Sequence, residues 1–147
     1  LIVKTWRPEG SGTIWLDVGY RMPVMTSSSG IAYLGALSRE EREKLETLLS
    51  VEAAEMCEEV WDYHRSQLRR LGYACVCEEV RYSRAINAVA TPFRPSEIGE
   101  PVSIFCGANV DDLSNARIHE QVGPELVQAV DKLKALTGHA VSAVASA

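Results

Sequence analysis

Three consecutive serines and a glycine, Ser27, Ser28, Ser29 and Gly30, form the most informative polar group in the chain. Serine is a favoured N-cap residue, so this run predicts a helix from about Ser29 to Leu37. The first turn of a helix has backbone N–H groups without intrahelical partners, and the helix dipole favours negative charge there. The run is therefore either a plain N-cap or a site for the carboxylate of a bound molecule.

The other reactive side chains are not spaced for a known catalytic or metal site. The four cysteines lack the paired spacing of a zinc site or a disulfide framework, so we expect reduced thiols that pack as small apolar groups. Cys75 and Cys77 lie two residues apart on a predicted strand, and a redox pair is the alternative. His64 lies on the apolar stripe of a predicted helix, which is typical of a core histidine. No nucleophile elbow, P-loop or dinucleotide motif occurs, and we expect neither a metal nor a cofactor.

These residues are carried by a recognisable order of elements. Residues 1–20 contain two runs of β-branched and aromatic residues around a PEGSG turn, which predicts a hairpin. After the serine run, Ser38 opens a second helix to about Leu49, and a third ends at Leu71 before Gly72. Three strand-like runs follow at residues 73–80, 85–93 and 101–108. A last helix, residues 112–137, should be kinked or split at its Gly-Pro pair.

Composition and order together predict the fold class. The chain has 147 residues, 46% of them hydrophobic and 24% charged, which is typical of one folded domain spanning residues 1–147. Strands grouped in sequence predict an α+β domain with a mostly antiparallel sheet flanked by helices. The net charge of −5 argues against nucleic-acid binding by this chain itself. No apolar run is long enough for a membrane span and no signal peptide is seen, so we expect no membrane partner and a cytoplasmic location.

Small side chains on two of the predicted strands indicate unfilled space. Strand alternation predicts that Ile86 and Ala88 share a face with Cys106 and Ala108 of the next strand. Such a surface either packs closely against a helix or forms one wall of a small-molecule pocket.

Several motifs in order resemble one known family. The segment GYRMPVMTSSSGIAYLGALSREE, residues 19–41, resembles the effector-domain signature of IclR-type bacterial transcriptional regulators. RRLGYA with EE soon after, INAVATPF, G-x-P-V-x-x-F and a closing helix near DDLS match in the family's order. The resemblance implies a GAF-like fold, a small-molecule effector, and a homodimer or homotetramer. It also implies that DNA is bound only through a winged helix-turn-helix domain on the N-terminal side, absent from this chain, which begins LIVKTW without a methionine.

The resemblance also implies a set of ligand-binding residues. These are Ser27, Ser28, Ser29 and Gly30 in the turn, Glu78 (or Val76, if the gap falls elsewhere), Ile86 and Ala88 on one strand, and Cys106 and Ala108 on the next. Ser28 stands where the family usually has alanine, and Ile31 where it has lysine or arginine. Cys106 and Ala108 stand where some members have serines, so we expect a less polar pocket that suits an aromatic or longer aliphatic acid.

Two other functions are compatible with the sequence. GAF-like domains include thiol-dependent reductases of small sulfoxides, for which Cys75, Cys77 and Cys106 would be the candidate thiols. The chain could also be a dimerisation module whose pocket is filled by its own side chains. We expect a ligand sensor without enzymatic activity.

Overall fold

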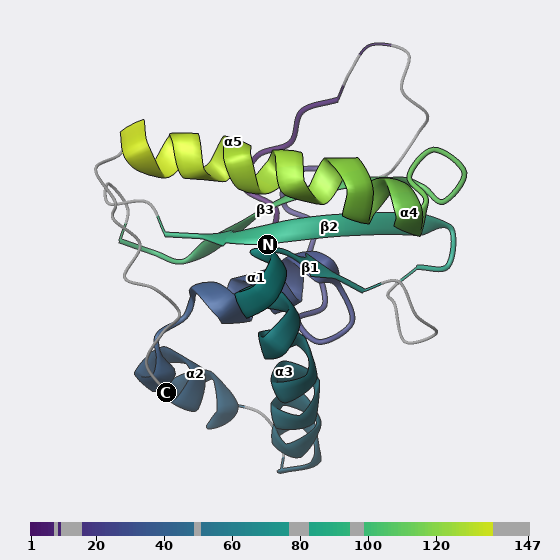
Figure 1. Ribbon diagram of the computed structural model, residues 1–147. Helices are drawn as coiled ribbons and strands as arrows, with labels where there is room; N and C mark the ends of the chain where they lie inside the picture. The colour runs from purple at the N-terminus through teal and green to yellow at the C-terminus, as the bar shows by residue number, and fades with distance from the viewer. Residues whose placement is uncertain (8, 10–15, 49–50, 77–82, 95–98, 137–147) are drawn as a thin grey trace.

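The structure is a computed structural model that describes residues 1–7, 9, 16–48, 51–76, 83–94 and 99–136, with residues 51–58 described by their backbone only (Figure 1). Its helices and strands are α1 (Ser28–Ala36), α2 (Arg39–Glu46), α3 (Val51–Leu71), β1 (Ala74–Cys75), β2 (Ile86–Phe93), β3 (Val102–Asn109), α4 (Asn115–Arg117), the π-helical turn η1 (Ile118–Val122) and α5 (Gly123–Leu136). The predicted α+β class is confirmed.

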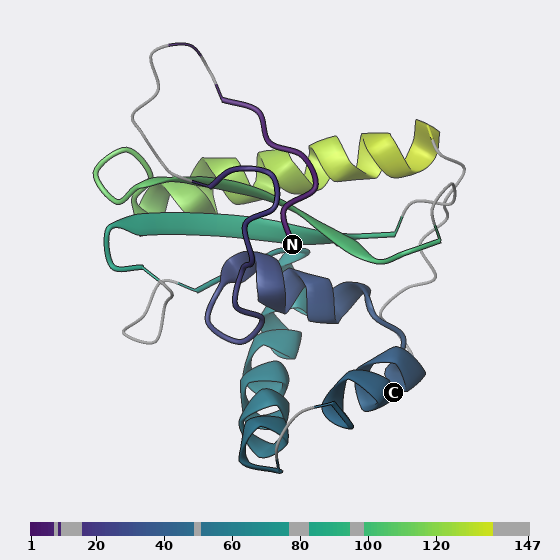
Figure 2. The same cartoon turned by 180° about the vertical axis from the view of Figure 1, so that it is seen from behind.

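The sheet separates two helical layers. Its strands are antiparallel in the order β1-β2-β3. In both views α5 crosses one face of the sheet, while α1 lies on the other face with α3 beyond it (Figures 1 and 2). Each face has its own apolar core. Ile31, Leu34, Leu37, Trp61, Leu68, Ala74 and Val76 form the core on the α1 side. Tyr73, Cys75, Val89, Phe93, Leu113, Ile118, Leu126 and Val130 form the core on the α5 side.

Local capping signals place the starts of α1 and α2 and the end of α3 close to where the sequence predicts them, whereas α2 ends at Glu46 and not near Leu49. The Ser27 hydroxyl caps α1 by accepting a hydrogen bond from the N–H of Gly30. Ser38 and Glu41 form a reciprocal capping box at the start of α2. Gly72 follows α3 with a φ of +77°, the left-handed conformation that glycine adopts without strain.

The predicted N-terminal hairpin is wrong for the described residues. The N–H of Ile2 donates to Tyr20 O at 2.9 Å, and the N–H of Gly19 donates to Ile2 O at 2.9 Å, so the two segments do meet. Neither residues 1–7 nor residues 16–20 form a strand. Ile2 is buried, whereas Val3 and Trp6 are 73% and 81% exposed. Because this segment buries so little apolar surface, its β-branched residues do not produce a strand that joins the sheet.

The last helical region is continuous from Asn115 to Leu136 and changes from π-helical to α-helical at its Gly-Pro pair. It begins at Asn115, with Ser114 as its N-cap, and not at residue 112 as predicted. In η1 the N–H of Gly123 donates to Ile118 O, five residues back. Pro124 lies in the first turn of α5, where its missing N–H costs nothing. A Cβ on Gly123 would lie 2.6 Å from the ring of Tyr73, so this close packing of helix and aromatic ring requires glycine.

The expectation of a reduced thiol is wrong for Cys75, which is disulfide-bonded in the structure. Its partner is not among the described side chains. No helix in the described part of the chain is both long enough and apolar enough to cross a membrane.

Candidate functional site

Hydrogen bonds within the turn before α1 use the hydroxyls of Ser27 and Ser29. The Ser27 hydroxyl donates to Pro23 O at 2.6 Å and accepts from the N–H of Gly30 at 3.0 Å. Its oxygen lies 3.2 Å from Oγ of Ser29, and because its proton goes to Pro23, Ser29 is the donor of that pair. These two hydroxyls therefore hold the turn in shape and have no proton left for a ligand.

The hydroxyl of Ser28 lies between two strands. Cys75 pairs with Val89, so a continued ladder would place Val76 directly opposite Ala88. Instead, Ser28 accepts a hydrogen bond from the N–H of Val76 at 3.0 Å and donates one to Ala88 O at 2.7 Å. One side chain of α1 thus replaces a direct β1–β2 hydrogen bond, and the two strands diverge at this point.

Gly30 allows the preceding loop to pack against α1. A Cβ on Gly30 would lie 2.1 Å from the carbonyl oxygen of Val24, closer than any real contact. The glycine therefore fixes how near residues 22–26 lie to the first turn of the helix.

Two backbone donors at this helix start are available. Within the described part of the chain, no group accepts a hydrogen bond from the N–H of Ser28 or of Ser29, whereas those of Gly30 and Ile31 both donate to Ser27. Ser28 and Ser29 are the first two residues of the nine-residue helix α1. The positive end of the helix dipole and two N–H donors can bind a carboxylate or another small anion there.

A cavity of about 40 Å³ adjoins these donors. Its lining is mainly apolar and comes from the N-terminal segment, the α1 turn and all three strand regions. The lining residues are Leu16, Met22, Thr26, Ser27, Ser28, Ser29, Val76, Ser83, Ile86, Ala88, Phe105 and Gly107. An apolar wall with a few placed polar groups is typical of a small-molecule site.

The strand register corrects one of the predicted groupings. Ala88 lies opposite Gly107, and Val89 lies opposite Cys106, so Cys106 points to the face away from Ala88. Ala108 lies on that same far face, against the α5 core. The prediction that Cys106 and Ala108 share a face with Ile86 and Ala88 is therefore wrong, and the argument for an aromatic ligand that depended on it does not hold.

The β3 residues that line the cavity are Phe105 and Gly107, in place of the predicted Cys106 and Ala108. Four further lining residues, Leu16, Met22, Thr26 and Ser83, were not predicted from the sequence. Only the register identifies the two β3 residues, and the other four come from loops that carry no periodic signal. The predicted residue Glu78 lies outside the described residues, whereas Val76, its alternative, is buried and lines the cavity.

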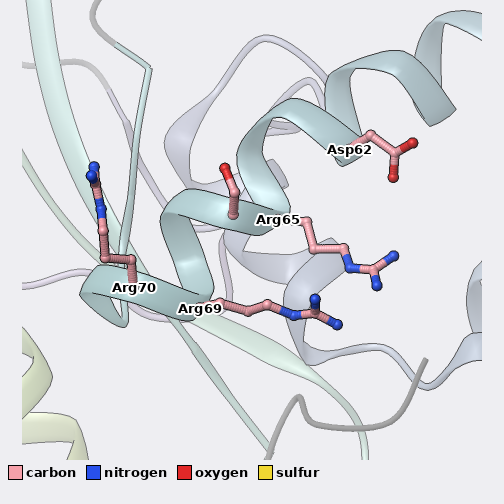
Figure 3. Close-up of a pocket in the computed structure, with 5 residues that line it drawn as sticks. Asp62, Arg65, Arg69 and Arg70 are labelled. Carbon is pink, nitrogen blue, oxygen red and sulfur yellow. The ribbon is translucent and has the colours of Figure 1, made fainter.

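A second hollow, of about 440 Å³, lies on the outer surface of α3 and is lined by Asp62, Arg65, Ser66, Arg69 and Arg70. Figure 3 shows Asp62, Arg65 and Arg69 extending to one side of the helix and Arg70 to another. The residues that line this hollow are all charged or polar, whereas most of those that line the α1 cavity are apolar.

Several solved structures have a fold similar to that of this chain. No protein-family model matches the chain, and no curated protein does. Among solved structures, an IclR-family transcriptional regulator from Brucella abortus aligns with 89% of this chain and 50% of its own, at 22% identity and a TM-score of 0.73. HmgR of Pseudomonas aeruginosa aligns with 95% of this chain and 55% of its own, at 14% identity and a TM-score of 0.65. The fold is that of an IclR-type effector domain.

The IclR-type fold is also found in the inducer-binding domain of PobR from Acinetobacter, a double mutant in complex with 3-hydroxybenzoic acid. That domain aligns with 90% of this chain and 78% of its own, at 18% identity and a TM-score of 0.60. The chain spans about half the length of the Brucella and Pseudomonas proteins. The Brucella protein is a transcriptional regulator and PobR is a transcription factor.

Proposed function

We propose that the chain is the ligand-sensing domain of an IclR-type DNA-binding transcriptional regulator, and that its effector binds at the N-terminus of α1. The observation that carries this proposal is the cavity in which the donors of Ser28 and Ser29 adjoin an apolar wall. The IclR-type fold supports the same role. Catalysis is not part of the proposal, because partial desolvation raises the pKa of the Cys106 thiol, which lowers its reactive thiolate fraction.

The proposed effector is a short-chain carboxylate. Its carboxylate would accept the N–H groups of Ser28 and Ser29, and its carbon chain would lie against Ala88 and Phe105. The cavity of about 40 Å³ is a few times the roughly 10–15 Å³ that one water molecule needs. This volume favours a chain of a few carbons over an aromatic ring.

A thermal-shift screen tests the ligand class directly. Acetate, pyruvate, butyrate and benzoate are compared with acetamide and benzamide, which have similar shapes without the charge. A ligand at about one hundred times its Kd stabilises the domain by about 2.7 kcal/mol, which raises Tm by about 5–10 °C. A short carboxylate should raise Tm and its amide should not. Equal shifts from acid and amide would contradict anion binding at the helix start, and no shift from any carboxylate would contradict the sensor itself.

A matched pair of variants tests the location. Ala88→Val adds two methyl groups inside the cavity, and Ala85→Val makes the same change at an exposed position outside its lining. The Ala88 variant should lose the ligand-induced shift while the Ala85 variant keeps it. The unliganded Tm of each variant shows whether the substitution has disturbed the fold. Retained binding in a folded Ala88→Val protein would place the ligand elsewhere.

The regulator itself would contain a DNA-binding domain in addition to this one. Effector binding would change the arrangement of subunits, and hence the spacing of their DNA-binding domains on an operator. In a cytoplasmic regulator of this kind, the carboxylate that raises Tm should also change affinity for operator DNA. Ala88→Val should remove that change and leave DNA binding without ligand intact, which a fluorescence anisotropy titration measures.

A further inference from the structure

The strand β1 has little pairing of its own. Only its two residues, Ala74 and Cys75, pair with β2, whereas β2 and β3 pair over eight residues each. On its other side β1 has no neighbouring strand among the described residues. So short a ladder fixes a strand weakly, and other contacts must hold β1 in place.

Side chains of two different helices bind consecutive N–H groups at the end of β1. The N–H of Cys75 donates to Oε1 of Gln67 on α3 at 3.1 Å. The next N–H, that of Val76, donates to Oγ of Ser28 on α1 at 3.0 Å. Because successive N–H groups of a strand point to opposite sides, Ser28 lies on the side of β2 and Gln67 lies on the open edge. The end of β1 is therefore held from both sides by helices.

The residue before β1 is fixed more firmly than its end. Tyr73 is 3% exposed, and its hydroxyl lies 2.9 Å from Nδ1 of His119. From this fixed point the chain runs to Val76, which is buried and lines the α1 cavity. The hydrogen bond to Gln67 lies between the two, so it acts on the part of the chain that carries the cavity wall.

We propose that Gln67 is a positioning residue for the α1 cavity. The half-buried Gln67 is not among the residues that line the cavity, so it acts through β1. By binding the N–H of Cys75 it sets how far Val76 stands from Ala88, and hence the width of the cavity between them. The inference rests on the proposed function, which makes this cavity the effector site. Because coupling between sites is reciprocal, a molecule that displaces Val76 also changes the hydrogen bond of β1 to α3.

Amide hydrogen exchange of the unliganded 147-residue protein, measured by NMR, tests the proposal. Gln67→Met keeps the length of the side chain and removes the acceptor, whereas Gln67→Glu keeps an acceptor oxygen at the same place. Gln128→Met makes the first change at an exposed position of α5 and serves as the control. In Gln67→Met, exchange should become about fivefold faster or more at Cys75, and also at Val76, whose N–H bonds to Ser28 instead. Gln67→Glu and Gln128→Met should exchange at wild-type rates at both amides.

A reciprocal measurement separates positioning from the loss of one hydrogen bond. Ser28→Ala removes the acceptor of Val76 and leaves that of Cys75, yet exchange at Cys75 should also become faster. Exchange at Thr91, which pairs with Ile104 of β3, reports general destabilisation and should change less than at either β1 amide.

Several results would overturn the proposal. Effects confined to Cys75 in Gln67→Met, or to Val76 in Ser28→Ala, would show two independent hydrogen bonds and no positioning. Equal acceleration in Gln67→Glu would show that the acceptor is not what acts, and equal acceleration at Thr91 would reduce the effect to lost stability. No change at either amide in Gln67→Met would mean that the disulfide of Cys75 and the ladder hold β1 without Gln67. Because no ligand is present, none of these results bears on the sensing role, which the thermal-shift screen of the wild type tests separately.

Discussion

The loss of stability on removing the Ser28 hydroxyl can be estimated from its hydrogen bonds. Among the described residues, this hydroxyl alone connects the main chains of Val76 and Ala88, where β1 and β2 diverge. Ser28→Ala removes the acceptor of the Val76 N–H and the donor to Ala88 O. Leaving a buried polar group without its partner costs about 1–3 kcal/mol. With two groups affected, we expect the free energy of unfolding to fall by about 3 kcal/mol, which lowers Tm by about 6–12 °C in a domain of this length.

Urea denaturation of the wild type and of Ser28→Ala measures the loss, with Ser114→Ala as the matched control. Ser114 is an exposed N-cap whose hydroxyl accepts one hydrogen bond, from Arg117 N, so its removal should cost only about 1 kcal/mol. Amide hydrogen exchange at Val76 should become faster in the Ser28 variant.

Alanine is also the residue that the IclR-type signature has at this position, which makes the opposite result informative. If Ser28→Ala costs no more than Ser114→Ala and exchange at Val76 stays slow, then the two strands have closed and paired directly. That outcome would refute the argument that the hydroxyl is needed to satisfy both backbone groups.

Three further predictions concern single side chains. The hydrogen bond from Arg94, with the capping bonds of Ser38, lowers the pKa of Glu41 from 4.5 to about 2; the stability it contributes is therefore complete above about pH 4.5 and lost as pH falls toward 2. Glu41→Gln should flatten this part of a Tm-against-pH curve, and an unchanged curve would exclude Glu41 as its source. Thr91→Val should raise the free energy of unfolding by about 1 kcal/mol in urea, because the buried Thr91 hydroxyl has no hydrogen-bond partner among the described residues; a loss of stability would indicate a partner for it. Gly30→Ala should lower Tm despite alanine's better helix propensity, at a cost of about 3 kcal/mol, because its Cβ would overlap Val24 O; a neutral result would show that the loop yields.

The helix starts and ends could be predicted because their signals are local. The Ser27 cap and the Ser38 capping box each involve atoms within three residues of one another, so the sequence contains the whole interaction. The same holds for Gly72, whose positive φ ends α3. The N-terminal hairpin failed because strand formation there depends on distant apolar surface, and residues such as Trp6 find none.

The composition of the site could be predicted only in part, because it depends on how two strands align. Alternation along β2 and β3 identifies the residues that share a face within each strand, but not which face of β3 matches which face of β2. A shift of one residue exchanges Cys106 for Phe105 beside Ala88, and only the observed register decides between them. The serine turn was found because the capping motif and the family signature coincide there.

The π-helical turn between α4 and α5 has a consequence for helix phase. Leu126 lies eight positions after Ile118, so at about 100° per residue the two side chains would be about 80° apart in an uninterrupted α-helix. The one extra residue in the turn of η1 offsets about 100° of rotation, so both side chains are buried against the same core. Without that residue, the two would be seven positions apart, which is about 700° of rotation and about 20° short of two full turns. An ordinary α-helix would then place both side chains on the same face. The closing helix can therefore differ in length by one residue at η1 and still present the same apolar surface to the sheet.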